Sequence, residues 1–509
     1  MELIKNTINV CHKTAKGVTQ AMADGDVIVP DVKPDILKLL EVNSDACITD
    51  KYIENGRLVI CGRVNYKVLY VPDSENEKIK SISASMEFRQ VVDGGGADAD
   101  SKIMLKPTVE RVEFSTVNSR KLRLRAIVHI EYEISRLCDM DICTDIDGDG
   151  FEKLCDSVSF EDTVDISEHD FTVRESIEIP SGAESVCEIL KTDARIYDTE
   201  YKSVTGKVIV KGNLGVCVLY TDTDNEIRFI EAELPFTEVL DAEGVSEDAV
   251  CDIDYFVLGV MSGCEPDSDG DMRLITLDID ICAALKCTET RRSALLCDCY
   301  MPYMQTGCER EELTLCVTKE RPQMQNTIRE IIELGDGAPA LKKVYNVMTN
   351  AVITKSELKR NKIMCEGKVE AYILYLTDSA ESPVYSFKKD IPFSYMIECQ
   401  SDTDGLMCEI KAGINHVSYN LNSGGEVEIR CLVCIDCMLI KEEKINNICD
   451  ISVNDSESRN GIVIYFANKG ERVWDIAKRY AVPTQSLNAH NEMESDTIEN
   501  AMKLFIPNR

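Results

Sequence analysis

Three stretches of the 509-residue chain alternate between apolar and polar residues in the same way. They read LVICGRVNYKVLYV from Leu58, KVIVKGNLGVCVLYT from Lys207 and KIMCEGKVEAYILYL from Lys362. In each stretch, apolar residues recur at every second position after a glycine, which is the period of a β-strand with one buried face. The alternation therefore predicts three equivalent strands.

Each of these glycines is followed eight residues later by a tyrosine, which gives the pairs Gly62 and Tyr70, Gly212 and Tyr220, and Gly367 and Tyr375. Successive glycines are 150 and 155 residues apart, so one long unit occurs three times. A glycine on an apolar face removes a side chain where packing needs one, and this predicts a bulge or a close backbone approach. We expect the tyrosines to bury their rings while each hydroxyl reaches a polar group or the domain edge.

A second strand is predicted 52 residues after each tyrosine, over residues 122–134, 272–285 and 427–440. Each follows a polar segment, at 117–121, 267–271 and 422–426, whose turn residues predict a hairpin. In the second repeat the apolar positions, which begin at Ile275, are one residue out of step with the other two repeats. One inserted residue would restore the buried face, because a shift by one position turns every side chain to the opposite face.

The opening segment of each repeat, from Val27, Ile177 and Ile332, predicts a short strand followed by a short helix. Ser181 and Glu184 have the spacing of a capping box, and Pro34 suits a first helical turn. The expected fold class is therefore mainly β, with three tandem antiparallel β-sheet domains that each carry one short helix.

The predicted domain order follows from these repeats and from acidic segments between them. It is an N-terminal segment at 1–26, repeats at 27–145, 177–290 and 332–450, acidic linkers at 146–176 and 291–331, a polar linker at 451–460, and a C-terminal domain at 461–509.

The C-terminal stretch differs from the repeats in charge and in pattern. Residues 461–509 contain six basic and six acidic side chains, so the acidity of the chain lies before them. A strand at 462–466 is followed by a turn at Lys469-Gly470, a helix with apolar residues at helical spacing, a second short helix around Leu487, and a strand at 504–507. This order predicts a βααβ unit.

The segment GERVWDIAKRYAVPTQSLNAHN from Gly470 and the closing KLFIP resemble a LysM domain. The residues that match the family pattern are Gly470, Trp474, Ile476, Ala477, Tyr480, Val482, Leu487, Asn491, Leu504, Ile506 and Pro507. LysM domains typically bind N-acetylglucosamine polymers in a groove between two loops. Here Glu471-Arg472 replaces the usual Asp-Thr of one loop, and Asn500 stands where the other usually has a glycine.

Three acidic β repeats followed by one LysM unit resemble the SPOCS-domain sporulation proteins of clostridia. The resemblance implies that each repeat is a SPOCS-like domain. It also implies a place in the mother cell, at the forespore surface, and binding of the coat morphogenetic ATPase SpoIVA, and possibly of other coat proteins, through the LysM domain.

The charge balance excludes two classes of partner. Lysine and arginine total 56 against 90 acidic residues, and the net charge of −34 repels nucleic acid and anionic lipid surfaces.

The N-terminus lacks the apolar core of a secretory signal, and no run of residues is apolar enough for a transmembrane helix, so we expect a cytoplasmic protein without direct membrane insertion. The 23 cysteines are expected to be mostly reduced.

Three segments contain residues that often bind metals or phosphates. Asp145–Asp156 has carboxylates at the spacing of a calcium loop, but its eighth position is Glu152 and no helix precedes it, so an acidic linker is the favoured interpretation. Cys431, Cys434 and Cys437 lie on one predicted strand, where residues three apart face opposite sides, and are interpreted as packing residues. The loop at 93–96 lacks the lysine of a phosphate cradle. We therefore expect no cofactor, no metal and no enzymatic activity.

The remaining candidate is a docking surface on the C-terminal domain. Trp474 is the only tryptophan and lies early in the first predicted helix beside charged residues, a combination typical of interface hot spots. The predicted partner-binding residues are Glu471, Arg472, Trp474, Asp475 and Lys478. The leading hypothesis is a non-enzymatic spore morphogenesis adaptor that binds a SpoIVA-like ATPase here. The alternative is a protein that binds peptidoglycan or N-acetylglucosamine polymers of the cell wall or spore cortex.

Overall fold

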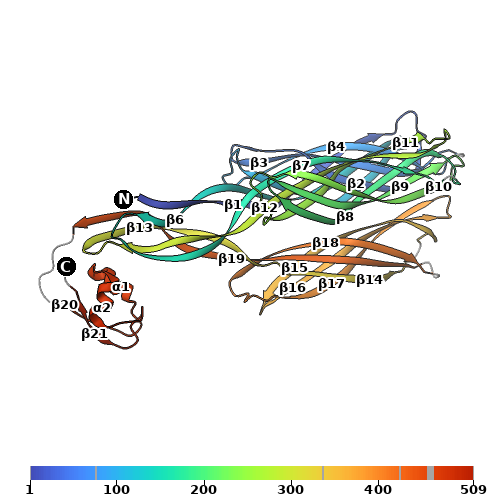
Figure 1. Cartoon of the computed structure of the whole chain (residues 1–509). Coiled ribbons are helices and arrows are strands. Elements are labelled where there is room, and N and C mark those ends of the chain that lie inside the picture. Colours follow the sequence, from blue (N-terminus) through green and yellow to red (C-terminus); the bar gives the residue numbers. More distant parts are fainter. Residues whose placement is uncertain are drawn as a thin grey trace.

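The computed structural model describes residues 2–74, 77–180, 182–334, 338–422, 426–455 and 463–507. These residues form three similar β units and a small C-terminal module (Figure 1). None of the helices in these ranges is long and apolar enough to cross a membrane.

The strands fall into three sets that follow the sequence repeat. Unit 1 contains β1 (Glu2–Ile28), β2 (Ile36–Glu54), β3 (Arg57–Pro72), β4 (Lys80–Asp93), β5 (Lys102–Asn118) and β6 (Lys121–Asp147). Unit 2 contains β7 (Glu152–Glu178), β8 (Val186–Val204), β9 (Lys207–Asp222), β10 (Ile227–Asp241), β11 (Val250–Pro266) and β12 (Met272–Tyr300). Unit 3 contains β13 (Met304–Glu320), β14 (Gln323–Ile332), β15 (Leu341–Lys359), β16 (Lys362–Thr377), β17 (Val384–Glu398), β18 (Leu406–Leu421) and β19 (Val427–Asp455).

Each unit folds its strands into two antiparallel sheets. In unit 1 the sheets have the orders β1-β6-β5 and β2-β3-β4, and unit 2 repeats them as β7-β12-β11 and β8-β9-β10. Unit 3 has β15-β16-β17 and a sheet in which β19 pairs with β13, β14 and β18. The predicted strands supply the core: Val64 and Val68 of β3 pack in one cluster with Leu124 and Ala126 of β6. The two sheets therefore form a sandwich around the apolar faces that the alternation predicted.

One long strand of each unit continues beyond its sandwich. β6, β12 and β19 pair with β1, β7 and β13 as far as Asp147, Tyr300 and Asp455. Equivalent apolar side chains of the three hairpins gather there in one cluster, as Cys143, Leu296 and Ile448 do. We call this three-hairpin extension the stalk and the three sandwiches the head; Figure 1 shows the stalk reaching away from the head toward the C-terminal module.

The three units also meet within the head. Equivalent leucines, Leu69, Leu219 and Leu374, lie in one buried cluster. Beside them, the ammonium of buried Lys191 lies 3.3 Å from Asp193 of its own unit and 3.5 Å from Glu41 of unit 1. Burial opposes the charge of this lysine, but the two carboxylates outweigh it and raise its pKa. The contact therefore holds two units together through a buried ion pair. Separation of the two units would leave a buried charge without its partner, which is destabilising.

Asp193 also joins unit 2 to unit 3. Its carboxylate accepts hydrogen bonds from the hydroxyl of Tyr345 at 3.3 Å and from the amide of Asn346 at 3.2 Å. Glu41, Lys191 and Asn346 occupy equivalent positions of the three repeats, since they are 150 and 155 residues apart. Three different side chains at one equivalent position make the three contacts chemically distinct, and so favour one arrangement of the units.

The predicted short helices are wrong. Residues 36–54, 186–204 and 341–359 form β2, β8 and β15. In β2, irregularities in the pairing lie between Ile36 and Lys38 and between Leu39 and Glu41, and the same two irregularities recur in β8 and β15. Each extra residue breaks the alternation, so apolar side chains recur at a spacing that imitates a helix. Ser181 of the predicted capping box lies outside the described residues.

The segments predicted as linkers contain long strands. Most of 146–176 is β7, and 291–331 contains the end of β12, all of β13 and most of β14, while 1–26 belongs almost entirely to β1. The parts of these segments next to the hairpin ends form the stalk, whereas β14 and the later residues of β1 and β7 pair in the sheets of the head. Pro322 separates β13 from β14 because a proline has no N–H for the sheet, although its carbonyl still accepts from Cys437 N–H at 3.0 Å.

The predicted hairpins are confirmed where the structure describes them. Residues 119–120 connect β5 to β6, and residues 267–271 connect β11 to β12. The second loop has five residues, whereas the first has two. Because the three extra residues are an odd number, they turn Ile275 back to the buried face, where its exposed fraction is 0%. The tip of the third hairpin, 423–425, lies outside the described residues.

The expectation of reduced cysteines is wrong for one pair. Cys251 of β11 and Cys287 of β12 are directly opposite each other in the sheet and form a disulfide. Adjacent strands bring two cysteines this close only when their register agrees, which the sequence spacing did not reveal. The other cysteines are free.

The repeated glycines allow a close approach by a phenylalanine of the neighbouring strand. A Cβ atom on Gly367 would lie 2.4 Å from the Phe393 ring and 2.5 Å from the Val352 carbonyl oxygen. Gly62 and Gly212 face Phe88 and Phe236 in the same way. Both expected features occur, since each partner strand also has an irregular register opposite the glycine.

Gly367→Ala is expected to destabilise the chain by about 1–3 kcal/mol, because the added methyl group would overlap Phe393 and a backbone carbonyl. Thermal unfolding of the full chain followed by circular dichroism measures the effect. Gly413→Ala on β18 is the matched control, since no heavy atom lies within 4 Å of its added Cβ. Equal melting temperatures for the two variants would show that the close approach does not constrain the fold.

The three repeated tyrosines are buried, as predicted: Tyr70 and Tyr375 are 0% exposed and Tyr220 is 4% exposed. The hydroxyls of Tyr70 and Tyr375 donate to the carbonyls of Pro34 and Pro339 at 3.1 and 2.9 Å.

Tyr220→Ala is expected to cost on the order of 3 kcal/mol or more, because removal of a buried ring leaves a cavity. The loss is measured as a lower urea midpoint of the full chain. Tyr201→Ala, at a side chain that is 42% exposed, provides the comparison. A Tyr220 variant as stable as the Tyr201 variant would contradict a structural role for the ring.

Candidate partner-binding site

The C-terminal module has the predicted βααβ order. It consists of β20 (Val463–Ala467), α1 (Val473–Tyr480), α2 (Thr484–Asn491) and β21 (Met502–Ile506), with β20 and β21 paired antiparallel. Its core contains residues from all four elements, and Leu487 and Leu504 are fully buried. α1 ends where Ala481 adopts the left-handed conformation, with φ of 50°.

Two of the predicted site residues contact the end of the stalk. The indole N–H of Trp474 donates to Asp298 Oδ2 at 2.9 Å, and the ammonium of Lys478 pairs with the other oxygen of the same carboxylate. The Trp474 ring also meets Tyr300 edge to face, with 5.1 Å between ring centroids. This face of α1 is therefore covered in part by the last residues of β12.

Tyr300 belongs to the stalk by sequence and to the module by packing. Its side chain is 1% exposed and lies in the same apolar cluster as Val473 and Leu487. Its hydroxyl donates to the Val482 carbonyl at 2.9 Å, and Tyr303 N–H donates to the Ala481 carbonyl at 2.6 Å. This contact could not be predicted from the sequence, because nothing in the local pattern of β12 distinguishes Tyr300 from a residue of the stalk core.

Asp298 is the electrostatic centre of the contact. Besides Trp474 and Lys478 it accepts from Arg310, whose Nη2 lies 2.5 Å from Oδ1. Partial burial acts to raise the pKa of this carboxyl, but hydrogen bonds from Lys478 and Trp474 outweigh it and lower the pKa. The carboxylate is thus held in its charged form at the surface where the module meets the stalk.

The hydrogen bonds and ion pairs described for the other three predicted residues lie within the module. Glu471 accepts from the Tyr465 hydroxyl at 2.8 Å and from Asn468 N–H at 3.0 Å. Arg472 and Asp475 pair with each other at 2.9 Å and are exposed. Glu471 therefore has a structural role within the module, and Arg472 and Asp475 form an exposed ion pair. Trp474 and Lys478 contact the stalk.

A second surface of the module carries exposed apolar side chains. Ile464 and Phe466 of β20 and Phe505 of β21 are 46%, 66% and 52% exposed, and Ile464 is paired with Phe505 in the sheet. They lie on the face of the sheet opposite the helices, and we call them the sheet face. Its signal was present in the sequence, since residues that alternate with the buried positions of a strand covered on one side must face outward.

The two loops that bound the predicted sugar groove are joined by backbone hydrogen bonds. Gly470 N–H donates to the Ile498 carbonyl at 2.8 Å, and Ile498 N–H donates to the Glu471 carbonyl at 2.9 Å. These bonds occupy backbone groups that would otherwise be available to a ligand.

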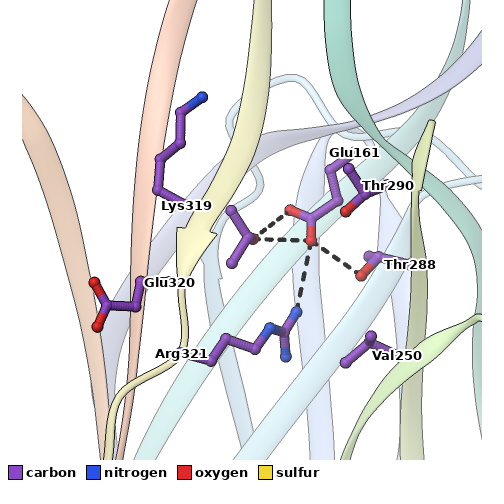
Figure 2. Close-up of a pocket in the computed structure, with 8 residues that line it drawn as sticks. Glu161, Val250, Thr288, Thr290, Lys319, Glu320 and Arg321 are labelled. Atoms are coloured by element: carbon purple, nitrogen blue, oxygen red, sulfur yellow. Dashed lines mark hydrogen bonds and ion pairs between the residues drawn. The ribbon is translucent and has the colours of Figure 1, made fainter. Parts of the chain in front are cut away.

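A cavity of about 220 Å³ lies between units 2 and 3 (Figure 2). Its central carboxylate, Glu161, accepts from Thr318 at 2.9 Å and from Thr288 at 3.1 Å, and pairs with Arg321 at 3.5 Å. The volume is below that of typical ligand pockets, and the acid is already satisfied by its neighbours. The arrangement fits a polar joint between two units better than a binding site.

The two metal-like motifs have structural roles in their strands. Asp145 lies near the end of β6, where Lys153 of β7 pairs with it at 2.6 Å and lowers its pKa. Cys431 and Cys437 lie in the core of unit 3, whereas Cys434 is buried outside that cluster. Within the described ranges, no three histidine, cysteine, aspartate or glutamate side chains have a metal-binding arrangement.

Acid is expected to release the module from the stalk. The pKa of Asp298 is lowered by the contact, so its stabilisation is present above the ordinary aspartate pKa of about 3.9 and is lost as the pH falls through the lowered value. The only tryptophan reports this step, because its emission should shift to the red when the ring enters water. Asp298→Asn should produce the shifted emission already at neutral pH.

Asp475→Asn is the control, since the ion pair of Asp475 is with Arg472 of the module itself. Far-ultraviolet circular dichroism must show that both variants retain the wild-type β signal. An Asp298→Asn protein with wild-type emission would contradict the contact between module and stalk.

Comparison with known families identifies the repeated unit. The family model described as "SipL, SPOCS domain" matches residues 35–117, 185–265 and 341–422. The matches begin at or just before β2, β8 and β15 and end within one residue of the ends of β5, β11 and β18, so they leave most of the stalk outside. No curated protein and no solved structure matched the chain. The chain is therefore a SipL-like protein with three copies of the SPOCS domain, a domain that indicates a sporulation-related role.

Proposed function

We propose that this protein is a non-enzymatic adaptor in spore morphogenesis. The three SPOCS domains and their stalk form a rigid support, and the C-terminal module at the stalk end binds a SpoIVA-like morphogenetic ATPase during coat assembly on the forespore surface. The adaptor would act in the mother cell cytoplasm.

The observation that carries this proposal is the position of the module. Tyr300 and Asp298 attach it to the far end of the stalk, away from the head, while its sheet face and the Arg472–Asp475 pair stay exposed. A small module held on a long support at a defined place fits a role in presenting a binding surface. The βααβ order supports its assignment as a LysM domain.

The polar groups within the protein support a non-enzymatic role. Glu161, Asp193 and Asp298 are each satisfied by hydrogen bonds or ion pairs that join units or attach the module. A catalytic acid or base needs a free position for the substrate, whereas these carboxylates have structural partners.

The partner-binding residues remain a prediction with a specific consequence. Trp474 and Lys478 bind Asp298, so a partner that uses the same face of α1 must displace the end of β12. Competition of this kind would make the affinity for the partner depend on Asp298. The affinity of a partner that binds the sheet face would instead not depend on Asp298.

Trp474→Glu is expected to weaken binding of the full chain to a SpoIVA-like ATPase by roughly 2 kcal/mol or more, about thirtyfold in Kd, because it places a charge at the predicted hot spot. Asp298→Asn should tighten binding, since it removes the competing contact. Phe466→Glu, on the sheet face, should have little effect. Biolayer interferometry with the immobilised ATPase gives the three affinities.

The opposite pattern, in which Phe466→Glu abolishes binding and folded Trp474→Glu protein binds normally, would move the docking surface to the sheet face. The alternative function is tested with the same proteins and chitin oligomers, because the module resembles glycan-binding domains. Tight binding of the oligomers together with no measurable affinity for the ATPase would replace the adaptor by a glycan-binding protein.

A further inference from the structure

Two cysteines lie side by side next to the contact that holds the module. Cys299 of β12 and Cys308 of β13 have their sulfur atoms 3.8 Å apart. Cys299 is flanked by Asp298 and Tyr300, which both contact the module. Cys299 is buried, whereas Cys308 is partly exposed.

The two sulfurs have unequal acidity. The hydrogen bond from Cys299 lowers the pKa of Cys308 to about 6 against the effect of burial, and the ammonium of Lys478 contributes to the lowering while Asp298 opposes it. The same hydrogen bond raises the pKa of Cys299. Cys308 is therefore accessible enough and acidic enough to attack first as a thiolate. Cys299, which is buried and less acidic, would react second.

The charged groups around the pair come from three elements. Asp298 lies on β12 beside Cys299, Arg310 on β13 pairs with Asp298, and Lys478 reaches from α1. Part of the positive charge that favours the Cys308 thiolate thus belongs to the module. The acidity of Cys308 depends in part on the module being attached to the stalk.

We propose that Cys299 and Cys308 form a redox modification site that reacts with small-molecule disulfides. The Cys308 thiolate attacks one sulfur of the reagent, forms a mixed disulfide and releases one thiolate. Cys299 then loses its proton and attacks the Cys308 sulfur, which forms the Cys299–Cys308 bond and releases the second thiolate. The protein is oxidised by two electrons, the reagent is reduced to two thiols, and the two protein protons balance the thiolates.

The product would tie β12 to β13 across the turn that carries Tyr303. The end of β12 and the turn hold the residues that contact the module, so the bond would fix the surface that receives it. The site does not depend on the identity of any partner, and its chemistry stands apart from the proposed adaptor function.

Treatment of the full chain with oxidised glutathione near neutral pH tests the site. No lysine or arginine lies between Arg292 and Arg310, so trypsin releases residues 293–310 as one peptide with Cys297, Cys299 and Cys308. After oxidation and alkylation of the remaining thiols, we expect this peptide to carry one alkyl group and to be two mass units lighter than expected for free thiols. Cleavage at Tyr300 or Tyr303 should leave its two parts joined until reduction.

Single variants assign the roles of the two sulfurs. Cys299→Ser should stop at a glutathione adduct on Cys308, and Cys308→Ser should remain largely unmodified. Cys297→Ser is the matched control and should still form the bond, because burial raises the pKa of Cys297 and its sulfur contacts the Leu295 carbonyl.

The pH dependence of alkylation separates a reactive pair from mere proximity. The midpoint for Cys308 should lie near pH 6 in wild-type protein, stay low in Cys299→Ser, which keeps a hydroxyl donor, and rise in Cys299→Ala. Lys478→Met should raise the midpoint as well. A peptide that keeps three alkylatable thiols under oxidising conditions, or a Cys308 midpoint near the ordinary value of about 8.5, would overturn the proposal.

Discussion

The mutual burial of three long hairpins is the constraint on which the rest of this structure depends. A single two-stranded hairpin is at best marginally stable in water, because it has no second layer to cover its apolar side chains. Here each hairpin covers the other two, and equivalent residues such as Cys143, Leu296 and Ile448 share one cluster. The stalk can therefore form only when all three repeats are present, and its end offers Asp298 and Tyr300 to the C-terminal module.

Sequence repetition alone would not determine how the three units are arranged around one another. The polar groups between the units in the head favour one arrangement. Glu41, Lys191 and Asn346 occupy one equivalent position, yet one is a buried acid, one a buried base and one a partly exposed amide. Exchange of two units would place a buried charge beside the wrong neighbour, which costs more than a surface mismatch. Equivalent leucines supply the common apolar contact, and the polar triplet makes the three interfaces different.

Much of the fold could be predicted from the sequence, because strand alternation and the Gly62–Tyr70 spacing depend on local geometry. The helix predicted after Val27 failed because bulges near Leu39 interrupt that local rule, and bulges depend on the partner strand. The stalk was interpreted as acidic linkers for a related reason: a stripe buried by two other hairpins is narrower than the face of a sandwich strand. For the site, the βααβ order and the importance of Trp474 followed from local pattern, whereas its bond to Asp298 joins residues 176 positions apart and could not.

The attachment of the C-terminal module to the stalk end is the central claim, and hydrogen exchange of the Tyr303 amide tests it most directly. This N–H donates to the Ala481 carbonyl across the contact. Mass spectrometry should show slow exchange for this amide in the full chain and rapid exchange in a chain that ends at Asp455, with the strands of the head unchanged. Equal exchange at Tyr303 in the two chains would contradict the attachment.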